Sequence, residues 1–374
     1  MSDDDKNYAL KSEDSQQELP APELPFRPQF PDTCPAIGLI GCGGITEQHL
    51  TACKNAGLKV VALCDINEDN AKAKAAEFFP DAKVLTDGDA LLADDSIEVV
   101  DIALHAEPRA EWIEKALRAG KHVLSQKPFV LDLAIGEKLV AIAKEEGRLL
   151  AVNQNGRFAP YFRYAQLAID AGLIGKVQTV NLQVCWDHGW VAGTPFEKIP
   201  HLLLYDFGIH WIDMACCLMG RPAHTANALI QRSASQSIAP ALVGSAQLAF
   251  DGGVASIHLD GSVKTGAYES VEIIGTKGRI SATGKPLEAH SLELITAEGI
   301  AKPKLDGHWM PEGFGGAMGE LLCAIAEDRQ PFNSAAHNLE SLKAAFALIS
   351  SVDEGRQIKV GDATVAGPNC KIQD

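Results

Sequence analysis

The sequence predicts an α/β protein with two domains: a doubly wound parallel sheet, then an α+β domain built on an open, mostly antiparallel sheet. First, short apolar runs alternate with helical patterns between residue 35 and about residue 154, which is typical of parallel strands covered on both faces. Second, later runs alternate apolar and polar residues, which indicates a sheet with one wetter face. Third, the length of 374 residues suits two domains of roughly 100–200 residues.

The charge and the cysteine pattern argue against several classes of protein. The chain has 33 Lys and Arg against 49 Asp and Glu, a formal net charge of −16, which disfavours nucleic acid and anionic membranes as partners. No run of about 18 apolar residues occurs and the amino terminus is acidic and polar, so we expect neither a membrane span nor a secretory signal. The nine cysteines include no C-x-x-C pair, which favours buried thiols in the cytoplasm and no metal site.

Residues 1–34 contain eight acidic residues, three basic residues and five prolines. Such a composition buries too little apolar surface to form a core, so we expect an extended arm. It is either a solubilising tail or a strap across a neighbouring subunit.

The first domain is expected to span residues 35–154. Gly57, Gly120 and Gly147 stand where helices should end, and Asp132 where one should begin. Buried strands are expected at residues 36–40, 59–64, 97–104, 121–124 and 148–152, with helices near 46–56, 68–78, 108–119 and 132–146.

The second domain is expected to span residues 155–360, followed by a tail at 361–374. Its helices are expected near 160–171, 207–219, 315–327 and 335–353. Its strands are expected at 176–186, 247–250, 254–259, 270–275, 278–282 and 291–296, separated by turn signals.

A glycine turn joins the first strand to the first helix. Gly41, Gly43 and Gly44 allow backbone N–H groups to approach a pyrophosphate at the start of the helix. Asp65 follows the second strand, 24 residues after Gly41 (65 − 41), where a carboxylate can accept both hydroxyls of an adenosine ribose. The pattern predicts a dinucleotide site that favours NAD over NADP; the alternative is a structural turn beside a solvated carboxylate.

Three ionisable residues interrupt an apolar helix. Asp206, His210 and Asp213 have i, i+4, i+7 spacing, which places them within about 60° of one helical face. Buried carboxylates and imidazoles need partners or a wet cavity, so we interpret them as a site at which His210 exchanges a proton. A satisfied structural network is the alternative, and metal binding lacks further ligands at a suggestive spacing.

Other candidates lie near strand ends. Lys127 follows a strand of the first domain, at the sheet edge where ligands bind, and can donate to an alkoxide. Trp186 and His188 follow a strand of the second domain and are candidates for packing on a sugar ring, although loop tryptophans often pack locally. Asn155 and Arg157 are candidates for binding substrate, with a structural role at the domain junction as the alternative.

In combination these motifs resemble the glucose–fructose oxidoreductase/inositol dehydrogenase (Gfo/Idh/MocA) family. The resemblance covers about residues 35–360 and rests on the order of AIGLIGCGGIT, CDIN, AGKHVLSQKP, NGRF-AP, IGKV, DFGIHWID and IGTKGRI. It implies a Rossmann first domain, an open-faced second domain, NAD as cofactor, and a dimer or tetramer formed through the open sheet.

The resemblance also implies residue roles. Lys127 corresponds to the lysine of the family's E-K-P motif, His210 to the proton acceptor and Asp206 to its supporting group. Cofactor contacts are implied at Ile45, Leu104, His105, Gln126 and Asn155. The chain departs from the family where Gln126 replaces the glutamate, Leu104 and His105 replace a Thr-Pro pair, Arg109 stands for a histidine, and Thr46 for a third glycine.

The leading hypothesis is therefore an NAD-dependent dehydrogenase that oxidises or reduces a secondary alcohol of a sugar, cyclitol or derivative. One alternative is a hydrolase or lyase that retains NAD and works by transient oxidation and elimination. Another is a non-catalytic NAD(H)-binding regulator.

Overall fold

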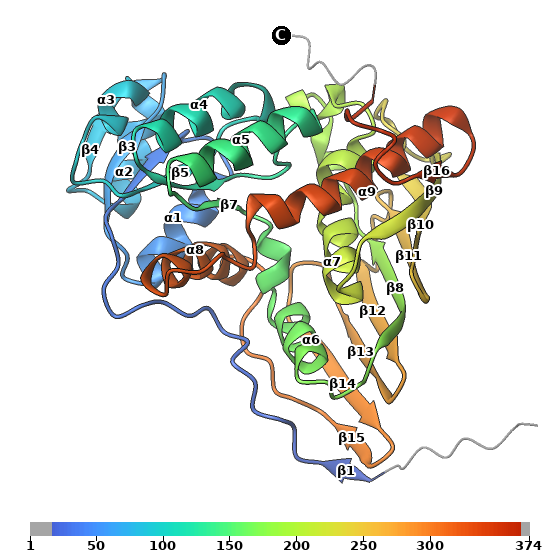
Figure 1. The fold of residues 1–374 in the computed structure, drawn as a ribbon. Helices are drawn as coiled ribbons and strands as arrows, with labels where there is room; N and C mark the ends of the chain where they lie inside the picture. The colour runs from blue at the N-terminus through green and yellow to red at the C-terminus, as the bar shows by residue number, and fades with distance from the viewer. Residues whose placement is uncertain (1–16, 368–374) are drawn as a thin grey trace, which may run out of the picture.

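The computed structural model describes residues 17–367, which fold around two β-sheets (Figure 1). One sheet has six parallel strands and the other has ten mostly antiparallel strands. This arrangement confirms the fold class predicted from the sequence. Across residues 17–367, every helix is too short or too polar to cross a lipid bilayer.

The parallel sheet is wound in both directions from its centre. All of its neighbouring strands run parallel, and the winding direction reverses between β2 and β5, the position where ligands of such sheets bind. The spatial order is β4 (Lys83–Leu85), β3 (Val60–Cys64), β2 (Ile37–Ile40), β5 (Val99–Ile102), β6 (His122–Ser125) and β7 (Leu150–Val152).

Helices connect these strands, and several begin at a side-chain cap. Asn67, Asp87 and Asp132 each accept a hydrogen bond from the backbone N–H two residues later, which satisfies a donor left unpaired by the helix. The helices are α1 (Thr46–Asn55), α2 (Glu68–Phe78), α3 (Gly88–Leu92), α4 (Ala106–Arg118) and α5 (Leu133–Glu145).

The large sheet begins and ends with two-residue strands. Neighbouring strands are antiparallel except for two parallel pairs, β1 with β15 and β8 with β11. The spatial order is β1 (Glu18–Leu19), β15 (Gly299–Ala301), β14 (His290–Thr296), β13 (Gly278–Gly284), β12 (Tyr268–Gly275), β8 (Val177–Cys185), β11 (Gly253–Asp260), β10 (Val243–Phe250), β9 (Ala223–Gln231) and β16 (Ile358–Lys359).

Helices pack on one face of this sheet and leave the other face open. In β8 and β10 buried residues alternate with exposed ones, as expected for a sheet with one apolar face. The covering helices are α6 (Pro160–Asp170), α7 (Ile209–Met219) and α9 (Ala335–Glu354), and Figure 1 shows α9 passing between α5 and the sheet.

Helix α8 (Glu312–Ala326) leaves the large sheet and packs beside the parallel one (Figure 1). Met318, Leu321 and Leu322 of α8 share a buried cluster with Leu50 of α1 and Leu124 of β6. The chain therefore returns to the nucleotide-binding half after building the large sheet.

Residues 17–34 pack against other parts of their own chain instead of projecting as a tail. β1 extends the large sheet, the Tyr164 hydroxyl donates to the Pro22 carbonyl oxygen at 2.9 Å, and Phe26 packs edge-on against the Tyr164 ring at 6.2 Å. Phe30 then packs against the core that contains α1 and α8. Residues 17–34 are extended and pack against both halves of their own chain. Residues 1–16 of the predicted arm lie outside the described part.

Candidate active site

The glycine turn after β2 has the geometry expected from its sequence. Gly41 has φ +97°, and a Cβ there would lie 2.8 Å from the Ala103 carbonyl oxygen, so only glycine fits this position. Thr46, where a third glycine was expected, is fully buried and donates from its hydroxyl to the Gly41 carbonyl oxygen at 2.8 Å. Thr46, although it differs from the family's glycine, therefore stabilises the turn through this hydrogen bond.

Asp65 stands at the end of β3 and fixes the same turn. Its Oδ2 accepts from the backbone N–H of Cys42 at 2.7 Å, and its Oδ1 accepts from that of Asn67 at 2.9 Å. Each carboxylate oxygen has a second lone pair, so Asp65 keeps the capacity to accept ribose hydroxyls.

The surroundings of the turn fit a dinucleotide. A Cβ at Gly43 or Gly44 would meet no atom within 4 Å, so the backbone there is open to a ligand. Helix α1 begins immediately afterwards without a side-chain cap, and such a helix end attracts phosphate. Gly43, Gly44 and Ile45 line a cavity of about 410 Å³ that continues toward Lys127 and His210.

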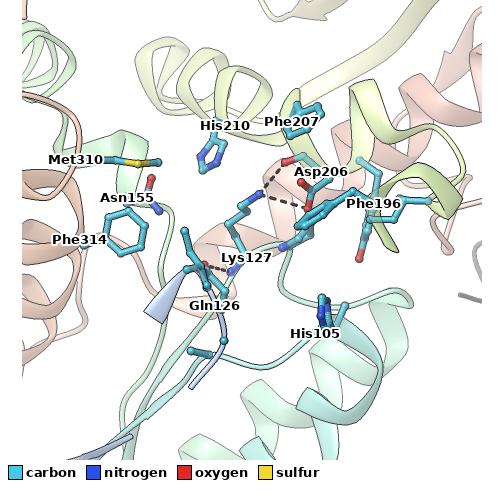
Figure 2. A pocket seen from close by; sticks show the side chains of 18 of the residues that line it. His105, Gln126, Lys127, Asn155, Phe196, Asp206, Phe207, His210, Met310 and Phe314 are labelled. Atoms are coloured by element: carbon cyan, nitrogen blue, oxygen red, sulfur yellow. Dashed lines mark hydrogen bonds and ion pairs between the residues drawn. The ribbon is translucent and has the colours of Figure 1, made fainter. Parts of the chain in front are cut away.

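Lys127 reaches this cavity from the end of β6. Its ammonium donates to the Asp206 carbonyl oxygen at 2.9 Å and lies 3.3 Å from the Asp206 carboxylate oxygen Oδ1 (Figure 2). Its backbone N–H donates to Gln126 Oε1 at 2.7 Å. The two predicted groups from distant parts of the chain are therefore in contact, and Asp206 pairs with Lys127 instead of supporting His210 as expected.

A buried network explains why glutamine suits position 126. His49 Nδ1 lies 2.7 Å from Asp101 Oδ2, and its Nε2 lies 3.3 Å from Gln126 Nε2 and 3.2 Å from Asn153 Nδ2. A proton on His49 Nδ1 leaves Nε2 to accept from the amides. Gln126 thereby donates to His49 and accepts from the Lys127 N–H, two roles that a carboxylate could not combine.

Asp206 and His210 are positioned by an irregular helix. Residues Leu203–Phe207 form a single π turn, after which α7 starts at Ile209. His210 Nδ1 is buried without a hydrogen-bond partner. Burial, with the nearby Lys127 charge, holds the pKa of His210 well below its usual value, so its imidazole is neutral near pH 7 and can accept a proton.

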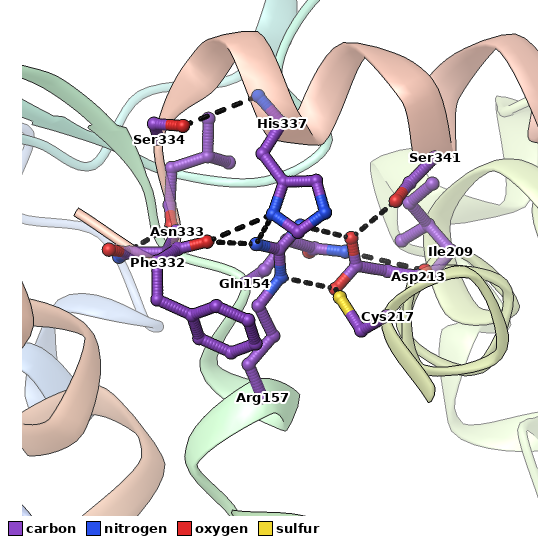
Figure 3. Close-up of polar contacts among 11 residues, drawn as sticks. Gln154, Arg157, Ile209, Asp213, Cys217, Phe332, Asn333, Ser334, His337 and Ser341 are labelled. Carbon is purple, nitrogen blue, oxygen red and sulfur yellow. Dashed lines mark hydrogen bonds and ion pairs between the residues drawn. The ribbon is translucent and has the colours of Figure 1, made fainter. Parts of the chain in front are cut away.

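Asp213 does not belong to this site. Its carboxylate accepts from Arg157 Nε at 2.7 Å, Arg157 Nη2 at 2.6 Å and the Ser341 hydroxyl at 2.6 Å (Figure 3). A sector of about 60° is wide enough for its edges to face different neighbours. The single polar face predicted for Asp206, His210 and Asp213 therefore divides into a cavity group and a structural ion pair.

Arg157 was a candidate for binding substrate, and this expectation is corrected by the structure. Its side chain is fully buried, pairs with Asp213, and donates to the Phe332 carbonyl oxygen at 2.5 Å. Burial opposes its charge, but Asp213 raises the pKa of Arg157 above its usual value. Arg157 ties the domain junction to α7 and α9 and does not line the cavity.

His188 also lies behind the cavity instead of lining it. It is buried and stacks on Phe207 with ring centroids 3.8 Å apart. Burial lowers its pKa to about 4, so it is a neutral support for Phe207. Trp186 packs edge-on against His188 at 4.7 Å and does line the cavity.

Most of the other predicted residues meet at the one cavity. Asn155 lines it while accepting a hydrogen bond from Trp309 Nε1 at 2.7 Å. Gly41 and Asp65 lie outside its lining, at the strand ends next to it. The predicted residues that line the cavity are Gly43, Gly44, Ile45, Leu104, His105, Gln126, Lys127, Asn155, Trp186, Asp206 and His210.

Sequence reasoning assigned no role to several lining residues. Arg109 is buried and donates to the carbonyl oxygens of Leu104, Gln126 and Pro128, so it holds together the two strand ends at the cavity. The signal in the sequence was that Arg109 stands close to Leu104, where the chain also departs from the family pattern. Phe207 and Trp211 lie within the motif DFGIHWID, but the sequence assigned them no role. The apolar lining outside the quoted motifs includes Phe196, Ile199, Leu287, Met310 and Phe314.

Within residues 17–367, no group of three or more His, Cys, Asp and Glu side chains is arranged to hold a metal ion.

Two family models match the chain in succession. Residues 36–154 match "Oxidoreductase family, NAD-binding Rossmann fold", and residues 162–281 match "GFO/IDH/MocA C-terminal domain". The chain belongs to the Gfo/Idh/MocA oxidoreductase family. The predicted NAD-binding Rossmann domain of this oxidoreductase is thereby confirmed.

Curated relatives cover nearly the whole chain. D-apiose dehydrogenase of Paraburkholderia graminis is 28% identical over 88% of this chain and 91% of its own length. Inositol 2-dehydrogenase of Rhizobium meliloti is 28% identical over 87% of this chain and 98% of its own length. Both are named as dehydrogenases of a sugar or a cyclitol.

Solved structures share the fold of this Gfo/Idh/MocA oxidoreductase. Scyllo-inositol dehydrogenase of Lactobacillus casei, solved with NAD(H) and scyllo-inositol, has a TM-score of 0.74 and 23% identity over 88% of this chain and 100% of its own. An oxidoreductase of Agrobacterium radiobacter, solved with NAD+, L-tartaric acid and magnesium, has a TM-score of 0.78 and 22% identity over 88% and 99%.

Proposed function

We propose that this oxidoreductase is an NAD-dependent dehydrogenase acting on a secondary alcohol of a sugar, a cyclitol or a derivative of one. The observation that carries the proposal is the contact between Lys127 and Asp206 in the cavity that His210 and the glycine turn also line. The names of the two curated relatives support the substrate class.

In this proposal the side chains divide the work of alcohol oxidation. The neutral imidazole of His210 accepts the hydroxyl proton. The Lys127 ammonium stabilises the negative charge that develops on the oxygen, where a fixed donor is most effective. Asp206 holds the Lys127 side chain in place through its carbonyl and its carboxylate. Asp206 is thus a positioning residue for Lys127.

The cofactor site follows from the turn described above. Gly43, Gly44 and the start of α1 would hold the pyrophosphate, and Asp65 would bind the adenosine ribose. Bound NAD would supply the hydride acceptor. Asp65 supports NAD over NADP, because its carboxylate would repel a 2′-phosphate.

Turnover of a panel of sugars and cyclitols tests the proposal. NADH formation is followed by absorbance with NAD or NADP, and the organic product is identified in parallel. We expect one NADH per oxidised carbinol, with NAD preferred. An aglycone released without NADH would instead indicate elimination with retained NAD, and tight NADH binding without turnover would indicate a regulator.

We also infer that two copies associate through the open face of the large sheet. Polar side chains gather in a shallow hollow on that face, among them Gln183, Gln247 and His258. Light scattering during size-exclusion chromatography should give at least twice the chain mass, and a monomeric mass would contradict this inference.

A further inference from the structure

An aromatic wall forms one side of the cavity beside Lys127 and His210. Trp190 packs edge-on against Phe196 at 5.6 Å and against Phe207 at 5.9 Å. All three line the cavity, and Figure 2 shows Phe196 and Phe207 on the side where Asp206 lies. Trp190 is 51% exposed, so its ring presents an apolar surface that the protein itself leaves uncovered.

The wall is supported from behind. Phe207 stacks on the buried His188, which also contacts Trp186. Phe207, at the base of the wall, is therefore held in place, and a ligand placed against it would lose little free energy to reorganisation of that ring.

The polar groups of the cavity are concentrated elsewhere. Arg109 (through Nε and Nη1), Gln126 and Asn155 direct side-chain hydrogen bonds to other parts of the protein. Lys127, Asp206 and His210 are gathered at one point. The cavity is thus equipped to bind one reacting hydroxyl at this point. Away from it, the polar side-chain groups of the aromatic side are the indole N–H groups of Trp186 and Trp190 and the imidazole of His105, which are few for a ring of further hydroxyls.

We propose that the substrate is a secondary alcohol joined to an apolar, preferably aromatic, substituent, as in an aryl glycoside. The reacting hydroxyl lies at Lys127 and His210, and the substituent packs on Trp190 and Phe196. Aromatic pairs gain free energy from burial and from ring geometry, whereas a buried hydroxyl without a partner is penalised. The inference rests on the proposed dehydrogenase activity and narrows its substrate class.

Matched methyl and phenyl glycosides of the same sugars test this inference with the full chain and NAD. The two members of a pair present the same hydroxyls and differ only in the substituent. We expect kcat/KM to be at least about tenfold higher for the phenyl member, the discrimination typical of one added apolar group in a pocket. Equal or better turnover of the methyl member, or of unsubstituted polyols, would overturn the inference.

Variants of the wall connect that preference to the named residues. Trp190→Ala and Phe196→Ala should bring the phenyl-to-methyl ratio close to one, while Trp190→Tyr should retain most of it. Ile135→Ala is the matched control, because Ile135 is an exposed apolar residue on α5 outside the cavity. An unchanged ratio in both alanine variants would remove the wall from substrate recognition.

A binding measurement separates this inference from the proposed oxidation. Calorimetric titration of phenyl and methyl glycosides into the NAD-loaded protein reports binding whether or not NADH forms. Tighter binding of the phenyl member without NADH would leave the ligand class standing and refute the oxidation. No preference in turnover or in binding would refute the ligand class.

Discussion

The ammonium of Lys127 donates to the backbone carbonyl oxygen of Asp206, 79 residues further along the chain, at 2.9 Å. Lys127 follows a strand of the parallel sheet, and Asp206 lies in the π turn that precedes α7. The contact therefore joins the two halves of the molecule at the cavity.

Replacing Lys127 or His210, the two groups proposed to act on the alcohol, should reduce turnover and leave the affinity for the cofactor nearly unchanged. For Lys127→Met we expect kcat to fall by about 10²–10³, and for His210→Ala by about 10²–10⁴. Steady-state kinetics give kcat, and fluorescence titration gives the dissociation constant for NADH, which should change little. Full activity in both variants would refute the assigned roles.

The acidic limb of the pH profile should lie below pH 6.5. Burial and then Lys127 lower the pKa of His210, so the proton-accepting neutral form persists as the pH falls and is lost only below the ordinary histidine value. In Lys127→Met one cause of the shift is absent, and the pKa of His210 should rise. The pH dependence of kcat/KM and an NMR titration of His210 measure the two effects; a rise in activity on acidification through pH 6.5 would contradict them.

Asp65 should control both the choice of nucleotide and the glycine turn. Asp65→Ser removes the charge that opposes a 2′-phosphate and weakens the contact with the Cys42 N–H. We expect NAD affinity to fall about tenfold, the effect of roughly 1.4 kcal/mol, while the affinity for NADP falls less or rises. Calorimetry with both nucleotides is the measurement, with the exposed Glu68→Ser on α2 as control.

The Arg157–Asp213 pair should matter for stability more than any surface ion pair. Arg157→Leu leaves the Asp213 carboxylate buried without its counter-charge, which costs about 3–5 kcal/mol. Urea unfolding measures this loss. Arg118→Leu, which breaks exposed pairs with Glu114 and Glu146, should cost about 1 kcal/mol or less. Equal effects would show that Asp213 finds another partner.

Residues 17–34 should detach when their contact with Gly319 of α8 is blocked. A Cβ at Gly319 would collide with the Gln29 carbonyl oxygen and crowd Phe30, so Gly319→Val should expose residues 17–34 to added protease. Phe30→Ala should act in the same direction. Arg27→Ala breaks an exposed pair with Asp306 and removes the guanidinium that lies over the Phe26 ring. It leaves the contacts of Gly319 with Gln29 and Phe30 in place and serves as the control. Identical cleavage rates in all variants would show that the attachment of residues 17–34 does not depend on the contact with Gly319.

The regular elements were predictable because their residues carry strong periodic signals. The strands that precede Gly41, Asp65 and Lys127 are short apolar runs bounded by turns, and they lie where predicted. β4 and α3 were missed because they are only three and five residues long. β9 was missed because its sequence AHTANALIQ mixes small and polar residues, and β1, β15 and β16 depend on pairing that a local pattern does not reveal.

The site was only partly predictable for a related reason. Sequence spacing correctly selects residues on one helix, such as Asp206 and His210, but the partner of Asp213 is an arginine 56 residues away. The direction of the Asp206 carboxylate depends on the π turn, which no propensity scale identifies. Lining residues such as Phe196 and Met310 come from loops that only the tertiary fold brings together.

The burial of Arg157 limits how this enzyme can open. Arg157 stands in the first turn after the last strand of the parallel sheet and is fastened to α7 and to the Phe332 carbonyl. A hinge needs residues whose backbone can rotate at little cost, and rotation here would break a buried, two-pronged ion pair. We therefore expect the halves to move as one body, with entry and exit of the substrate left to the segment that carries Trp190 and Phe196.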